Sequence, residues 1–394
     1  MTGTLLALLV PVALLALGAL VAYRVADRVA RSLLVPEPYG LQPEFTLRSV
    51  ATDPDDTTRL RLVLPLPSGR HVPQFARVDA EGRYGLLWHD DGAIGHGRLG
   101  PVLARDAQHV TRSLAPVSGA PPRPGAPARL DVTVYRRDPL RDHDLPFDEV
   151  RIDGPVGELA AWWLERPGDA AVVMVHGRRR GERNEALRAL PVIAASGASV
   201  LVSSYRNHDS SDPSPDGLFH YGAGEADDLL AALVWLRARD VARVVLVTYS
   251  MGGALALLAR ERWPADAPRL LAITLDAPLV DPREVLRQGV RRSGLPAAAA
   301  DLGLRLASRR TGVDFGALDL RRLAPTLDVP LLLHMTARDG TIPVALVDDF
   351  AARVPPRLLS YRRLERGDHV EAWNVDPRGY EAALGTFVAG ALAR

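Results

Sequence analysis

Arg243 to Ala259 reads RVVLVTYSMGGALALLA, and the rest of the chain can be interpreted outward from this stretch. It opens with a continuous run of β-branched and apolar residues, Val244 to Val247, which is typical of a buried strand. An alanine- and leucine-rich run with high helix propensity follows Gly253 at once. The pattern therefore predicts a strand, a sharp turn and a helix, with Ser250 at the apex of the turn.

A serine at the apex of such a turn is placed for chemistry. The turn lifts its hydroxyl clear of the sheet edge, and the backbone N–H of Met251 then lies beside a helix N-terminus, where negative charge is stabilised. Small flanking residues such as Gly252 leave room for a tight turn between strand and helix. A serine that merely caps the N-terminus of an ordinary helix would show the same local pattern.

In these residues the chain resembles the α/β-hydrolase superfamily, whose nucleophile elbow has the pattern Gly-x-Ser-x-Gly. Thr248 takes the place of the first glycine. The resemblance implies that Ser250 is the nucleophile and that the N–H of Met251 is one donor of an oxyanion hole.

The composition predicts a globular protein that binds no nucleic acid. Its 394 residues are 47% hydrophobic, enough for a sizeable core in one large domain or two ordinary ones. A net charge of +1 leaves no large positive field to attract nucleic acid. The absence of cysteine excludes disulfides, thiolate zinc sites and a cysteine nucleophile.

The chain begins with an apolar segment. Thr4 to Tyr23 contains no charged residue and has about the twenty residues that a helix needs to cross a bilayer. Because Arg24, Arg28 and Arg31 follow this segment, an uncleaved anchor is favoured over a signal peptide. The positive-inside rule then places the main domain in the cytoplasm, with export as the alternative. Residues 1–35 are thus predicted to form a single-pass cell-membrane anchor, continued by an amphipathic helix along the membrane surface.

Residues 40–147 have the pattern of a β-rich domain. Short alternating segments, such as Arg59 to Leu64 and Asp131 to Tyr135, are separated by glycine and proline. The proline-rich stretch Pro116 to Ala128 is expected to be a surface loop within this domain. No metal site is predicted from its irregularly spaced histidines, which are His71, His89, His96 and His109.

Residues 148–394 carry the resemblance to the hydrolases. Strands and helices alternate from Ala171 onward, which predicts a mostly parallel sheet whose active groups collect at the carboxyl ends of the strands. A buried strand over Ala171 to Val175 ends at His176-Gly177-Arg178. Here the resemblance implies that the N–H of Arg178 is the second oxyanion donor, because a glycine lets the backbone approach the substrate.

Groups that bind the substrate are expected at the same strand ends. The residues predicted for this role are His176, Gly177, Tyr205 and Tyr249. The basic run Arg178 to Arg180, with Arg183, lies where an acidic group of a substrate could dock, although a solvated surface run has the same pattern.

The remaining members of a catalytic set follow later strands. Residues 281–323 form a helical, arginine-rich insertion, where the resembling superfamily places a cap over the site. Asp339 follows the next predicted strand, and His369 follows the last one. The order Ser250, Asp339, His369 is the nucleophile, acid and base order of the superfamily. His369 would take the serine proton while Asp339 orients the imidazole.

These patterns predict a membrane-anchored serine hydrolase that cleaves a carboxylic ester or thioester through an acyl-enzyme. The expected partner is a small-molecule ester, and no metal or cofactor is implied, since the oxyanion hole supplies the electrostatic stabilisation. A serine peptidase of the same fold is one alternative. A non-catalytic hydrolase-fold binding protein at the membrane is another, and Thr248 in place of glycine favours it.

Overall fold

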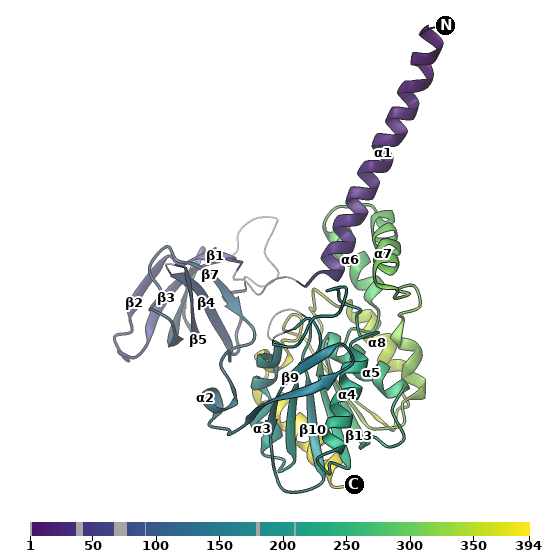
Figure 1. Cartoon of the computed structure of the whole chain (residues 1–394). Helices are drawn as coiled ribbons and strands as arrows, with labels where there is room; N and C mark the ends of the chain where they lie inside the picture. Colours follow the sequence, from purple (N-terminus) through teal and green to yellow (C-terminus); the bar gives the residue numbers. More distant parts are fainter. Residues whose placement is uncertain (1, 37–41, 67–76, 91, 179–181, 209) are drawn as a thin grey trace.

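The computed structural model describes residues 2–36, 42–66, 77–90, 92–178, 182–208 and 210–394, with the side chains of the first helix from Ala13 on. Three parts are visible in Figure 1: a long N-terminal helix, an antiparallel sheet, and a larger body built on a second sheet. The larger body carries the predicted catalytic residues.

The antiparallel sheet follows the first helix in the chain. Its described strands lie in the order β1-β7-β4-β5-β6-β3-β2, and alternate residues of these strands, such as Leu62, Leu64 and Trp88, bury a small core of their own. The strands are β1 (Phe45–Thr46), β2 (Ser49–Thr52), β3 (Leu60–Pro65), β4 (Tyr84–Asp90), β5 (Ala93–Arg105), β6 (His109–Ser118) and β7 (Pro127–Asp131). Most of the proline-rich stretch connects β6 to β7. His71 of the predicted β-rich domain lies outside the described residues.

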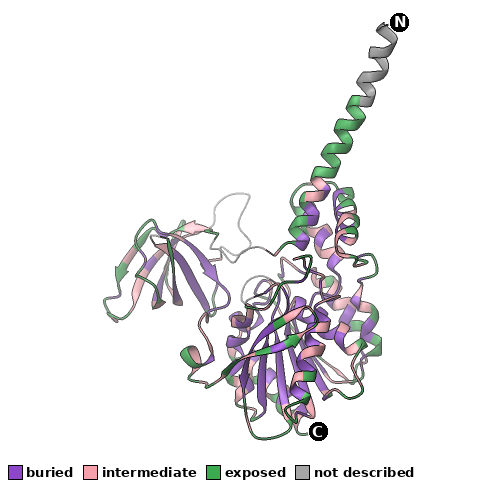
Figure 2. Cartoon of the chain, in the orientation of Figure 1, coloured by how far each residue is buried: buried purple, intermediate pink, exposed green. Residues whose placement is uncertain are grey.

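The second sheet has the order β15-β14-β13-β12-β10-β11-β9-β8 in the described residues. The pairings from β11 through β10 to β15 are parallel, whereas β9 and β8 extend one edge in antiparallel fashion. Its strands are β8 (Asp148–Gly154), β9 (Gly157–Leu164), β10 (Ala170–Val175), β11 (Ser199–Ser203), β12 (Arg243–Tyr249), β13 (Arg269–Asp276), β14 (Leu331–Thr336) and β15 (Leu359–Leu364). The central strands are continuous apolar runs because helices cover both faces, and Figure 2 shows them buried.

Helices and short 3₁₀ turns connect these strands. They are α1 (Thr2–Leu34), α2 (Pro139–His143), η1 (Glu182–Arg188), α3 (Leu190–Ala194), α4 (Ala226–Arg237), α5 (Met251–Glu261), α6 (Pro282–Arg292), α7 (Ala297–Thr311), η2 (Leu320–Thr326), α8 (Val344–Arg353), α9 (Ala372–Val375) and α10 (Pro377–Leu392). Helix α3 packs with α10, and α4 packs with α5. Helices α6 and α7 belong to the insertion between β13 and β14. They lie beside the lower end of α1 in Figure 1.

The strand order creates a place for a site. After β10 the chain crosses to β11 on one side, and it then returns to β12 on the other side of β10. At such a reversal the connections diverge and leave a crevice beyond the carboxyl ends of the two strands. The turns after β10 and β12 therefore meet there, which brings Gly177 next to Ser250.

The prediction of a transmembrane anchor over Thr4 to Tyr23 is wrong. Helix α1 forms, but no helix in the described part of the chain combines the length and apolar character needed to cross a membrane. Charged side chains interrupt the lower half of α1 from Arg24 on, and its apolar residues there are used in packing within the protein. The fold prediction is therefore wrong in its transmembrane helix, and the predicted location at a cell membrane is wrong for the same reason.

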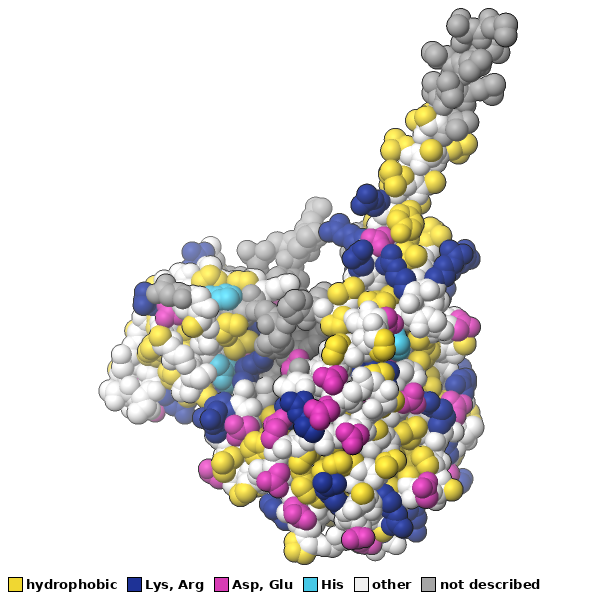
Figure 3. Space-filling view, in the orientation of Figure 1, with side chains coloured by type: hydrophobic (Ala, Val, Ile, Leu, Met, Phe, Trp, Pro, Cys, Tyr) yellow, Lys and Arg dark blue, Asp and Glu magenta, His cyan; other side chains and the backbone are white. Residues whose placement is uncertain are grey.

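The amphipathic half of α1 packs on the cap. Val29, Ala30 and Leu33 are buried, and the C-terminal part of α1 contacts α7. Gly303 of α7 lies so close to α1 that an added Cβ would be 2.4 Å from Cγ1 of Val29. Arg310 pairs with Asp27 across the same seam. Figure 3 shows basic side chains gathered where α1 meets these helices.

Candidate active site

Ser250 stands on a strained turn between β12 and α5. Its φ of 48° and ψ of −112° lie outside the regions that ordinary residues occupy. The turn is held by backbone hydrogen bonds from Ser250 N–H to Asp276 O (2.9 Å) and from Leu279 N–H to Ser250 O (3.0 Å). The Ser250 side chain makes no capping hydrogen bond to α5. Its hydroxyl is therefore not occupied as an ordinary helix cap.

Small residues allow the close packing of this turn. A Cβ on Gly252 would lie 2.4 Å from the carbonyl oxygen of Val175, and one on Gly177 would lie 2.9 Å from Cβ of Ser250. The position of the first glycine in the resembling pattern is occupied by Thr248. A side chain is tolerated there because the Thr248 hydroxyl donates to the carbonyl oxygen of Thr274 on the neighbouring strand (2.8 Å). A buried hydroxyl with a hydrogen-bond partner costs little. Thr248 thus replaces the glycine of the resembling pattern without opening the turn.

The structure brings Ser250, His369 and Asp339 together. Nε2 of His369 lies 2.9 Å from Oγ of Ser250, and its Nδ1 lies 2.8 Å from Oδ2 of Asp339. The second oxygen of Asp339 accepts the backbone N–H groups of Thr341 and Ile342, each at 2.7 Å. These bonds fix the carboxylate so that it can hold the imidazole in one orientation.

The electrostatic surroundings favour proton uptake by His369. Burial acts to lower the pKa of His369, but the charge and hydrogen bond of Asp339 outweigh it and raise that pKa above the ordinary value of 6.5. Glu185 and Asp368 add negative charge nearby and act in the same direction. An imidazolium formed during a reaction would therefore be stabilised at this place.

A cavity of about 450 Å³ opens above these residues. Ser250, His369, Met251 and Arg178 are among its lining residues, so both predicted oxyanion residues lie at the cavity beside the serine. Its other walls come from the cap, from the loops after β14 and β15, and from the end of the antiparallel sheet. Residues there that the sequence patterns did not single out include Val132, Glu185, Gln288, Arg292 and Val370.

Glu185 is the most informative of the residues that the sequence did not indicate. Its Oε2 accepts the N–H of Gly177 at 2.6 Å, and its Oε1 lies 3.6 Å from Nη2 of Arg188. The carboxylate therefore fixes the turn after β10. No local pattern could indicate this contact, because it depends on how η1 folds back over the turn.

The predicted substrate-binding residues divide into two groups. Gly177 lines the cavity. His176, Tyr205 and Tyr249 are buried in the core, and the rings of His176 and Tyr205 stack with centroids 4.5 Å apart. The Tyr205 hydroxyl donates to the carbonyl oxygen of Gly177 at 3.0 Å, so this pair supports the turn from behind.

The described arginines of the basic run after β10 do not gather in one place. Arg178 donates to the carbonyl oxygen of Leu33, at the end of α1, and to the Tyr221 hydroxyl. Arg183 pairs with Glu149 at 2.7 Å, away from the cavity lining. Arg179 and Arg180 lie outside the described residues.

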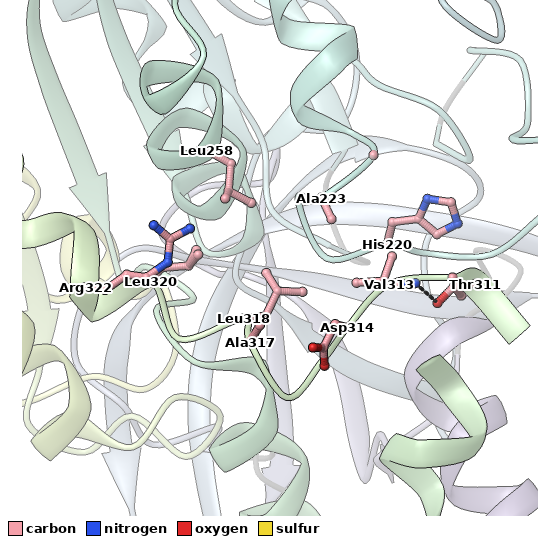
Figure 4. Close-up of a pocket in the computed structure, with 12 residues that line it drawn as sticks. His220, Ala223, Leu258, Thr311, Val313, Asp314, Ala317, Leu318, Leu320 and Arg322 are labelled. Carbon is pink, nitrogen blue, oxygen red and sulfur yellow. Dashed lines mark hydrogen bonds between the residues drawn. The ribbon is translucent and has the colours of Figure 1, made fainter. Parts of the chain in front are cut away.

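A second cavity of about 390 Å³ lies between α5 and the segment that descends from the cap (Figure 4). Its histidine, His220, is held by Asp216 at 2.8 Å. Its hydroxyl, Thr311, donates to Ala307 O and accepts the N–H of Val313. Among the residues drawn in Figure 4 no hydrogen bond joins His220 to Thr311, so this cavity does not show a nucleophile paired with a base.

Comparisons with known proteins agree with the fold. A family model described as a domain of unknown function (DUF8805) matches residues 74–131, within the antiparallel sheet. No curated protein matches the chain.

Two crystal forms of an esterase from Pyrococcus furiosus, Pf2001, are similar in structure. One has 20% sequence identity and a TM-score of 0.52, covering 64% of this chain and 94% of the esterase. The other has 20% identity and a TM-score of 0.50, covering 65% and 96%. At such identity the likeness concerns the fold alone, and it agrees with the α/β-hydrolase fold predicted for the larger body of this chain.

Proposed function

We propose that the protein is a serine hydrolase that cleaves a carboxylic ester or thioester through an acyl-enzyme. The observation that carries the proposal is the continuous contact from Ser250 Oγ through both ring nitrogens of His369 to Asp339, with distances of 2.9 and 2.8 Å. Nucleophile, base and orienting acid at these distances are what acyl transfer requires.

The chemistry follows from the geometry. His369 Nε2 takes the proton of Ser250 as its oxygen attacks the substrate carbonyl, while Nδ1–H donates to Asp339. The N–H groups of Met251 and Arg178 would stabilise the oxyanion of the tetrahedral intermediate. His369 then gives its proton to the leaving group, and it later activates water to release the acyl group from Ser250.

An ester is preferred over a peptide because of the cavity. Its walls include the cap helix α6, so the site is a covered pocket of about 450 Å³, which is within the range that suits a small molecule. The esterase named in the structural comparison also supports this class. A peptidase of the same fold remains the alternative within the enzyme class.

A fluorophosphonate probe tests the proposal. The wild-type protein is expected to be labelled, because an activated serine attacks the phosphorus of the probe, and Ser250→Ala should abolish labelling. His369→Ala should reduce the rate of labelling by several orders of magnitude. Ser360→Ala, at an exposed position of β15 outside the cavity lining, serves as a matched control and should be labelled normally. A folded wild type that takes no label would instead favour the non-catalytic binding protein.

A further inference from the structure

We propose that the antiparallel sheet positions the catalytic histidine of the hydrolase body, with Tyr84 as the positioning residue. The inference rests on the proposed function, because it concerns the loop that carries His369. It gives a role to a part of the chain that the comparisons describe only as a domain of unknown function.

One buried carboxylate oxygen joins the sheet to the histidine loop. Tyr84, at the start of β4, is 1% exposed, and its hydroxyl donates to Oε2 of Glu371 at 3.1 Å. The same oxygen accepts the N–H of Asp368 at 2.9 Å. Asp368 directly precedes His369, so the hydroxyl of Tyr84 is two hydrogen bonds from the backbone of the catalytic base.

From Asp368 the contacts continue to the acid. Its Oδ1 accepts the N–H groups of His369 and Gly340, each at 2.7 Å. Gly340 follows Asp339, so one carboxylate oxygen fixes the backbone of the base and of the acid loop together. The Thr336 hydroxyl also donates to Asp368 O at 2.9 Å. A displacement of this loop would therefore change the distance between His369 and Asp339.

Backbone contacts reinforce the seam. Arg83 N–H donates to Asn374 O at 2.9 Å, and the Asn374 side chain donates to the carbonyl oxygens of Arg83 (2.7 Å) and Val132 (2.9 Å). Gly82 has φ +127°, and a Cβ there would lie 2.2 Å from Asn374 O, so the close approach needs glycine. Val132, in the segment after β7, also lines the catalytic cavity.

The burial of this seam makes its hydrogen bonds matter. Burial raises the pKa of Tyr84, so its hydroxyl stays protonated and remains a donor. Burial also raises the pKa of Glu371. A buried carboxylate oxygen that loses one of its two donors is destabilised, so the loop would shift to recover a second partner. Catalytic groups need positions accurate to about half an ångström, and such a shift is enough to slow the reaction.

The test is Tyr84→Phe, which removes one hydroxyl. We expect kcat to fall about five- to tenfold, the effect of roughly one hydrogen bond, with KM nearly unchanged. The acid limb of the pH profile should also move to lower pH, because His369 would lose part of its contact with Asp339, while Glu185 and Asp368 remain near it.

Tyr361→Phe is the matched control. Tyr361 lies on β15 and is not among the residues that line the catalytic cavity. Its hydroxyl donates to Asp348 at 2.6 Å. Its removal should affect stability to a similar degree but leave kcat and the pH profile unchanged. All assays are made at 25 °C, with each variant folded as judged by its thermal unfolding.

A double-mutant cycle separates positioning from general destabilisation. Glu371→Ala removes the shared acceptor, so adding Tyr84→Phe to it should have no further effect on kcat. Glu371→Gln keeps an acceptor oxygen and should retain most of the activity.

The outcomes distinguish the two proposals. If the wild type is labelled by fluorophosphonate but Tyr84→Phe has the kcat and pH profile of the wild type, the positioning role is overturned and the serine hydrolase stands. Equal losses in Tyr84→Phe and Tyr361→Phe would also overturn it. An unlabelled wild type overturns both.

Discussion

His369 can act as a base only when its imidazole is neutral. Its pKa is raised above 6.5 by Asp339, so activity should be lost as pH falls through this raised value. We therefore expect the acid limb of kcat/KM to have its midpoint above 6.5. Asp339→Asn should lower that midpoint and reduce kcat about 10⁴-fold, because the imidazole loses its charge partner and its orientation.

The measurement is kcat/KM against pH with a neutral activated ester. Asp216→Asn is the control, since it breaks a second histidine–aspartate contact of the same length, 2.8 Å, between Asp216 and His220. This variant should keep the wild-type profile. A wild-type midpoint at or below the ordinary histidine value would contradict the prediction.

The residues that follow the parallel strands show how much of the candidate site could be predicted from residue types alone. Ser250, Asp339 and His369 were predicted from their places after three strands, and the structure places them within hydrogen-bonding distance. Residues beside the strand ends were harder to interpret. Tyr205 follows β11 as expected, yet its ring is buried in the core, where it stacks on His176.

Helix α1 and the cap helix α7 act as one packed unit. Gly303→Ala should lower the free energy of unfolding by about 1 to 3 kcal/mol, because the new Cβ would overlap Val29 and the helices would have to separate. Gly390→Ala in α10 is the matched control. Open space surrounds Gly390, so its replacement should instead stabilise the helix by about 0.5 to 1 kcal/mol.

Urea unfolding of the two variants measures this difference. Opposite signs are expected for the same chemical change in two helices. If both substitutions stabilise the protein, α1 does not pack on α7 in solution as described.

The observed role of α1 differs from the predicted membrane anchor. An apolar run and following arginines are typical of an anchor. In the folded protein, however, the lower half of α1 packs on α7, and Leu33 O accepts hydrogen bonds from Arg178 and Tyr221. These packed residues follow the apolar run, whose described large side chains from Leu14 to Tyr23 are exposed. Hydropathy measures how apolar a segment is, and it does not report which part of a helix packs on another helix.

At the scale of the whole molecule, one buried cation joins the larger body to the end of the antiparallel sheet. Arg188 of η1 is 3% exposed, and its Nη1 donates to Val370 O (2.8 Å) and to the side chain of Asn374 (2.9 Å). It also lies 3.4 Å from Val132 O at the end of the antiparallel sheet. Arg188 therefore contacts both the loop that carries His369, in the larger body, and the segment after the last strand of the antiparallel sheet.

Arg188→Met should lower the free energy of unfolding by about 2 to 5 kcal/mol, because it removes a donor from buried acceptors and the charge partner of the Glu185 carboxylate. Urea unfolding, with probes in both sheets, measures the change. Arg243→Met is the control: its partner Asp169 is half exposed, so the loss should be less than about 1 kcal/mol. Equal effects of the two substitutions would show that Arg188 does not hold the parts together.

The sequence by itself determined the parallel sheet and the candidate catalytic set of Ser250, Asp339 and His369. Parallel strands joined by right-handed crossovers bring their carboxyl ends to one rim, so residues that follow those strands meet there whatever else the chain does. Only the tertiary structure decided which surfaces cover one another: α1 on the cap, Tyr205 behind the oxyanion turn, and Tyr84 on the histidine loop. Tyr84 and Glu371 are 287 residues apart. No local periodicity encodes a contact at that separation, because it depends on how whole elements pack.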